Sequence, residues 1–149
     1  SQLVSGKGLA GVFYCLVAAA VVMLFNYRYI IHWEIVLLAV VLGGAVAVML
    51  GLLVGILVEN QASLGMWIGM ALVILVVPSM AMGFGSARLP AGLATFLSWT
   101  PGAAFNDLLR ASMYEPVSTA LLMKDAGILA VTALLIFFLV VWRVRRMDR

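Results

Sequence analysis

Four long apolar stretches, separated by short polar ones, dominate the sequence; they cover residues 8–25, 35–58, 64–84 and 126–142. A helix rises about 1.5 Å per residue, so about 20 apolar residues cross the roughly 30 Å hydrocarbon layer of a membrane. The stretches lack the period-two alternation of transmembrane barrel strands, and in lipid only helices and closed barrels satisfy every backbone polar group. The pattern predicts an all-α membrane protein with four transmembrane helices, in a single transmembrane domain over residues 1–149.

The segment between the third and fourth stretches is semi-apolar and is interrupted by glycine and proline. Thr100 followed by Pro101 is typical of a helix start, because threonine caps free backbone N–H groups and proline loses no hydrogen bond at the first helical position. A second short helix is expected after Pro90. Neither is long enough to cross a bilayer, so we predict a short re-entrant or interfacial helical hairpin over about residues 89–113, before the last transmembrane helix.

Charged residues of this hairpin gather on one face of its second helix. Asp107 and Arg110 are three residues apart and can pair. Asp125 is expected to be the N-cap of the last transmembrane helix. The residues that we assign to the hairpin are Pro90, Thr100, Pro101, Asp107 and Arg110.

Basic residues predict the orientation of the chain. Four of its nine Lys and Arg residues lie in the last seven positions, and Lys7 precedes the first stretch. Four crossings place both termini on one side, and basic residues mark that side as cytoplasmic. The polar turn at 59–61 then faces the cytoplasm as well, whereas the hairpin faces outward.

The composition excludes an ordinary soluble domain, because 66% of the residues are hydrophobic and only 10% are charged, against about 25% charged in soluble proteins. The net charge of +3 is concentrated near the C-terminus, which indicates membrane topology and not nucleic-acid binding. Membrane lipids are therefore expected partners.

Residues able to carry chemistry are few. No ionisable side chain lies in the middle of a predicted span, which argues against proton relays and ion-coupled transport. The chain has a single histidine, His32, and a single cysteine, Cys15. These provide no nucleophile–base pair and no metal-ligand set, so we expect neither catalytic nor metal residues and no cofactor on this chain.

Two pairs of glycines flank the turn between the second and third spans, at the four-residue spacing that lets helix backbones approach closely. These helix-packing candidates are Gly51, Gly55, Gly65 and Gly69. They indicate either packing within this pair of helices or a seam against a partner chain. A proline inside the third span, Pro78, indicates a kink or a flexible gate.

The succession of these motifs resembles the C-terminal four helices of the permease subunit of type-two ABC transporters, the exporter-like ABC membrane family. The motifs that carry the resemblance are Ser5-Gly6-Lys7 before the first span, the glycine-rich stretch and turn of 51–62, Val77-Pro78 with Gly83, Leu89-Pro90, Trp99-Thr100-Pro101, Asp107-Leu108-Leu109-Arg110, and the last span with its arginine-rich tail. The match covers nearly the whole chain but only four helices of a six-helix family. The family's Ser-Gly pair at the end of the fifth helix appears here as Met82-Gly83.

The resemblance implies a permease subunit of an ABC exporter in a bacterial inner membrane. ATP and Mg would bind a partner ATPase subunit, and a second permease copy or a homologous permease chain would complete the membrane dimer. The cytoplasmic face toward the ATPase would include Lys7, Glu59, Asn60 and Gln61. The cargo would be hydrophobic or amphipathic. The alternative is a non-catalytic structural subunit of a larger membrane protein complex.

Overall fold

The computed structural model describes residues 2–58, 61–85, 90–114 and 116–147, and the side chains of 9–58, 63–83, 90–114 and 116–146. Its elements are α1 (Gln2–Asn26), the 3₁₀ turn η1 (Tyr27–Tyr29), α2 (Trp33–Leu57), α3 (Gln61–Gly85), α4 (Ala91–Ser98), α5 (Pro101–Ala111) and α6 (Thr119–Met147). Over these ranges the secondary structure is helical. Four helices, α1, α2, α3 and α6, are long and apolar enough to cross a membrane. The predicted all-α membrane fold with two short helices before the last span is confirmed.

The last span begins earlier than predicted. Helix α6 starts at Thr119, so the expected start near residue 126 and the expected N-cap role of Asp125 are both wrong. The residues from Ala120 to Lys124 include two leucines and a methionine, and all of these residue types favour helix. The helix therefore begins where helix-forming residues begin, whereas the prediction placed its start at the last charged residue before the apolar stretch.

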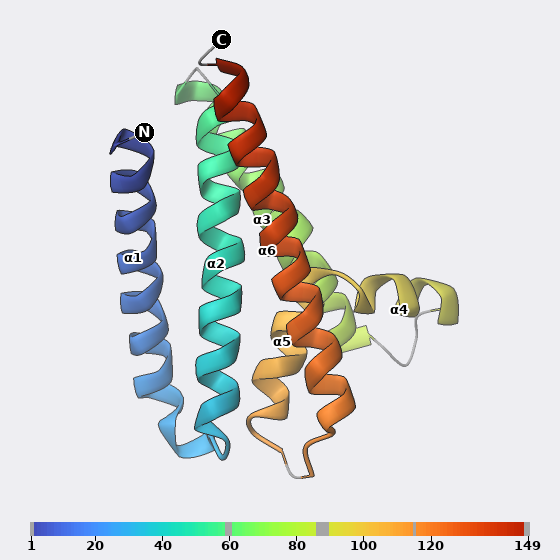
Figure 1. The fold of residues 1–149 in the computed structure, drawn as a ribbon. Coiled ribbons are helices and arrows are strands. Elements are labelled where there is room, and N and C mark those ends of the chain that lie inside the picture. The colour runs from blue at the N-terminus through green and yellow to red at the C-terminus, as the bar shows by residue number, and fades with distance from the viewer. Residues whose placement is uncertain (1, 59–60, 86–89, 115, 148–149) are drawn as a thin grey trace.

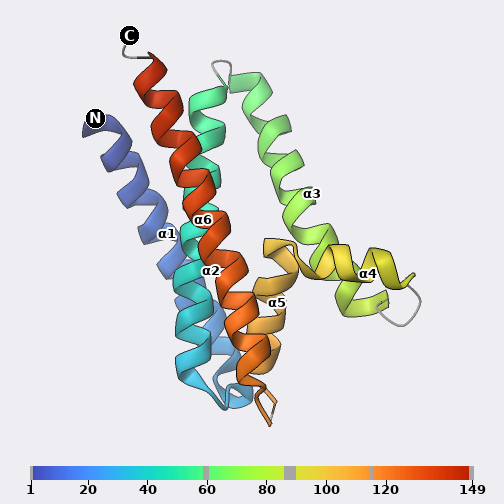
Figure 2. The ribbon, with the colours of Figure 1, turned by 45° about the vertical axis from the view of Figure 1, so that its right-hand side comes forward.

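Helices α1, α2 and α6 stand side by side, and α1 begins at the same end of the bundle at which α6 ends (Figure 1). Helix α2 also ends and α3 begins at this end, while η1 and the connection from α5 to α6 lie at the other. Helix α4 runs across the bundle direction and projects outward (Figure 2). Helix α5 lies alongside the first half of α6.

The core sits where α2, α5 and α6 meet. Its most buried side chains come from all three helices: Ala39, Ala104, Leu108, Leu129 and Ile136. By contrast, no side chain in the described part of α1 is buried, and α3 leaves large apolar side chains such as Met66 and Ile74 exposed. Helix α3 continues through Pro78 to Gly85. Helices α1 and α3 therefore present apolar surface to whatever surrounds the bundle.

Candidate functional site

At the joint between α4 and α5, one hydroxyl group forms hydrogen bonds with both helices. Thr100 Oγ1 donates to the carbonyl oxygen of Leu97 at 2.6 Å, near the end of α4, and accepts from the backbone N–H of Ala103 at 3.4 Å, in the first turn of α5. Pro101 follows at the first position of α5. The predicted helix start at Thr100-Pro101 is confirmed, and the threonine hydroxyl is a second donor to Leu97 O, which also accepts from the backbone N–H of Thr100 at 3.0 Å.

Helix α5 touches α3 through Gly102. A Cβ atom built on Gly102 would overlap the carbonyl oxygen of Leu75 and lie 2.9 Å from Ser79 Oγ. Real Cβ atoms essentially never approach another heavy atom to less than 3.0 Å. Because the obstacle includes backbone atoms of α3, which cannot rotate away, this approach of α5 to α3 requires glycine.

Helix α5 touches α2 through Phe105. A Cβ atom on Gly43 of α2 would lie 2.6 Å from two ring carbons of Phe105, so the ring occupies the space that a side chain at position 43 would need. On its remaining side, α5 packs Ala104 and Leu108 into the core beside Leu129 of α6. Helix α5 is therefore a wedge that joins three of the four long helices.

Arg110 ties the far part of α5 to the end of α3. Its Nη2 atom donates to the carbonyl oxygen of Gly83 at 3.5 Å, so its recorded hydrogen bond is to α3 and not to Asp107. The two residues still interact electrostatically. Burial raises the pKa of the Asp107 carboxyl above its ordinary value, and the charges of Arg110 and Lys124 oppose that rise.

Lys124 and Asp125 form a second polar cluster at the contact of α5 with α6. Lys124 Nζ lies 3.9 Å from Asp125 Oδ1 and 5.7 Å from the centroid of the Trp99 ring, a cation–π distance. Asp125 is only 4% exposed, and its Oδ1 atom has no hydrogen-bond partner among the described residues. Sequence reasoning missed this buried carboxylate because it placed Asp125 at a helix end.

The four glycines predicted to pack helices have no close neighbour in the described structure. A Cβ atom on Gly51, Gly55, Gly65 or Gly69 would meet nothing within 4 Å. The prediction that these glycines pack α2 against α3 is therefore wrong, because α3 diverges from α2 along its length (Figure 2). A seam against a partner chain stays a prediction.

The predicted cytoplasmic face lies mostly outside the described residues. Glu59 and Asn60 are outside them, and for Lys7 and Gln61 only the backbone is described, in α1 and α3. These two backbone positions lie at the end of the bundle where α6 also ends (Figure 1). Their role toward a partner stays a prediction.

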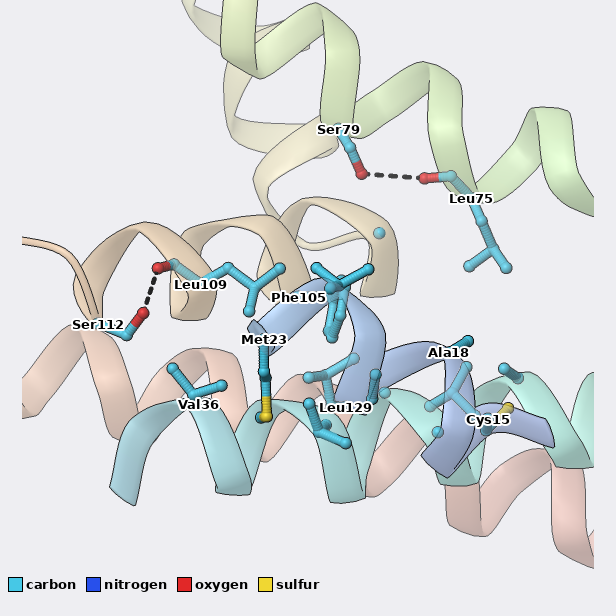
Figure 3. A pocket seen from close by; sticks show the side chains of 18 of the residues that line it. Cys15, Ala18, Met23, Val36, Leu75, Ser79, Phe105, Leu109, Ser112 and Leu129 are labelled. Carbon is cyan, nitrogen blue, oxygen red and sulfur yellow. Dashed lines mark hydrogen bonds between the residues drawn. The ribbon is translucent and has the colours of Figure 1, made fainter. Parts of the chain in front are cut away.

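A cavity of about 540 Å³ lies between α1, α2, α3 and α5 (Figure 3). It occupies the half of the bundle away from the termini, beside the wedge formed by α5. Phe105 projects from α5 toward α2 along its wall, and Ser79 and Leu75 of α3 lie on the opposite side (Figure 3). Its walls are almost entirely apolar, so the space is suited to an apolar occupant.

Among the described residues, no group of three or more His, Cys, Asp or Glu side chains could hold a metal ion. No protein-family model, curated protein or solved structure matches the chain. The sequence motifs and the geometry of the chain are therefore the basis for a functional proposal.

Proposed function

We propose that the chain is a membrane-spanning permease subunit of an ABC exporter in a bacterial inner membrane. It couples ATP hydrolysis on a partner ATPase subunit, which binds ATP and Mg, to translocation of a hydrophobic or amphipathic substrate. A second permease copy, or a homologous permease chain, completes the pathway. The proposal follows the resemblance of the sequence motifs to that family.

The observation that carries the proposal is the position of the two short helices. Helices α4 and α5 are inserted between the third and fourth long helices, in the half of the bundle away from the termini. In the family that the motifs resemble, a re-entrant hairpin occupies this place and caps the outer end of the substrate path. Gly102 and Phe105 lock α5 against α3 and α2, which supports a specific role for the insertion within the bundle.

The exposed apolar surface of α1 and α3 supports the need for partners. Large side chains such as Phe13, Phe25 and Ile74 are at least 60% exposed. Such surface is covered by lipid or by other membrane helices in a bilayer. The same observation favours the alternative function, a structural subunit of a larger complex, so the two must be separated by experiment.

The test is co-purification with an ATPase. The chain is tagged in its own host and extracted in mild detergent; the proteins that co-purify are identified and assayed for orthovanadate-sensitive ATP hydrolysis. The exporter proposal predicts that the ATPase is retained and that its activity depends on both proteins. Recovery of the chain without an ATPase, or as a fixed subunit of a respiratory or photosynthetic complex, would overturn the proposal.

Matched charge reversals at the two ends of α2 make this test specific. Glu59→Lys changes a residue that follows α2 in the sequence, on the proposed cytoplasmic face, and should reduce ATPase retention. Glu34→Lys makes the same change in an exposed side chain at the start of α2, a helix of 25 residues and roughly 37 Å in length, and should leave retention unchanged. Equal retention by both variants would contradict the assignment of the coupling face.

A further inference from the structure

The cavity between α1, α2, α3 and α5 leaves few hydrogen-bonding groups free. Three of its polar lining residues already donate to a carbonyl group of their own helix or turn. Asn26 Nδ2 donates to Val22 O at 2.9 Å, Ser79 Oγ to Leu75 O at 3.1 Å, and Ser112 Oγ to Leu109 O at 2.6 Å. A buried water needs two to four polar partners, so these walls favour hydrocarbon over water.

The cavity is about as deep as one leaflet of a bilayer. Its lining runs from Cys15 to Asn26 on α1 and from Val36 to Ala47 on α2. Each interval is about 16 Å long at 1.5 Å per residue, close to half of the roughly 30 Å hydrocarbon thickness. Because α1 and α2 run in opposite directions (Figure 1), Cys15 and Ala47 mark the same end of the cavity, and Asn26 and Val36 mark the other.

At the end of the cavity nearer the termini, α1 and α2 are in contact and form one wall of the cavity. A Cβ atom on Gly44 would lie 4.0 Å from Cys15 Cβ, and one on Gly11 would lie 3.6 Å from both methyl groups of Val48. These are ordinary packing distances. A transmembrane helix of a partner chain needs a groove open along the whole bilayer, whereas this cavity ends near the middle of α2.

We propose that the cavity holds one acyl chain of a membrane lipid from the leaflet opposite the termini. The depth of the cavity and its apolar walls match a single hydrocarbon chain that enters beside the end of α1. An empty cavity would forfeit dispersion contacts on every wall, and lipid tails surround the exposed faces of α1 and α3. The acyl-chain site does not depend on the exporter proposal, since a structural subunit with this cavity would bind the chain equally.

Two neighbouring alanines on α1 provide the test and its control. Ala19 lines the cavity, whereas Ala20, about 100° further around the helix, is exposed and does not line it. The substitution Ala19→Trp fills the cavity with an indole ring, and Ala20→Trp adds the same ring to the outer surface.

The wild type and both variants are placed in phosphatidylcholine nanodiscs that contain a trace of phosphatidylcholine with a photoactivatable diazirine in one acyl chain. After illumination, cross-linked peptides are located by mass spectrometry. We expect labelling of 15–26 and of α5 in the wild type and in Ala20→Trp, and loss of that labelling in Ala19→Trp. Equal labelling of the two variants at these sites, or no excess over the exposed surface of α3, would overturn the proposal.

A second measurement uses the wild type and needs no folded variant. Cys15, the single cysteine of the chain, lines the inner end of the cavity. In cholate micelles, whose detergent has no long alkyl chain, added phosphatidylcholine should slow the reaction of Cys15 with N-ethylmaleimide. A rate that does not change with phosphatidylcholine would contradict an acyl chain at this position. Both experiments use the chain alone, so their failure is distinct from failure to bind an ATPase.

Discussion

Replacement of Gly102 by alanine should separate α5 from α3. The carbonyl carbon of Leu75 and Ser79 Oγ would both lie 2.9 Å from the added Cβ, and the Leu75 carbonyl oxygen closer still. Ordinary contact begins at 3.4 Å; the two atoms at 2.9 Å alone require α5 to move by 0.5 Å, and the closer carbonyl oxygen requires a larger movement. Leu108 and Ala104 are carried with it, and a gap of 0.5–1 Å forfeits about a quarter to a half of each dispersion contact that they make.

The expected cost of Gly102→Ala is about 1–3 kcal/mol of unfolding free energy, the usual range for overpacking. It should lie toward the upper end, because backbone atoms of α3 cannot turn aside. Alanine has a better helix propensity than glycine by about 1 kcal/mol. The net loss of unfolding free energy is therefore smaller than the strain energy of the contact with α3. The measurement is unfolding in mixed micelles, followed by tryptophan fluorescence.

Gly127→Ala is the matched control for this prediction. Gly127 lies in α6, and a Cβ atom there would meet nothing within 4 Å. This variant should be as stable as the wild type or slightly more stable, through helix propensity alone. If Gly102→Ala proved as stable as Gly127→Ala, the close approach of α5 to α3 would be refuted, and with it the description of α5 as a wedge.

Three further substitutions test separate parts of the structure. Thr100→Ala should destabilise the start of α5 by about 1 kcal/mol through loss of the cap, seen as faster labelling of cysteines introduced between residues 103 and 110; unchanged labelling would contradict the capping role. Gly55→Leu should leave the fold of the single chain intact, because nothing described lies near Gly55, but should lower the yield of any complex that uses this face; an unchanged yield would exclude the seam. Burial raises the pKa of Asp107, so the native state binds the carboxyl proton more tightly than the unfolded state does. The stability contributed by this proton should be fully present below the unfolded-state pKa. It should be lost as the pH rises through the native-state pKa. Asp107→Asn should weaken that pH dependence in unfolding experiments, and an identical dependence would show that Asp107 is not its source.

The amino-acid sequence by itself determined the four long helices, the two short ones and the helix start at Thr100-Pro101. These features depend on local sequence: long apolar stretches form helices in lipid, and a threonine–proline pair is a local signal that favours a helix start. The start of α6 was predicted wrongly for a related reason. The charge of Asp125 suggests a helix boundary in the sequence, whereas the preceding helix-forming residues extend the helix back to Thr119.

Only the tertiary structure decided which helices are neighbours. The candidate site around α5 depends on these neighbours. Gly43 and Gly102 are 59 positions apart in the sequence, and both matter because α5 lies between α2 and α3. Glycine spacing alone pointed instead to Gly51 and Gly55, which face open space in the described structure. The burial of Asp125, the bond from Arg110 to Gly83 and the leaflet-deep cavity likewise arise from contacts between distant segments, because a periodic apolar pattern defines each helix but not the helix that packs against it.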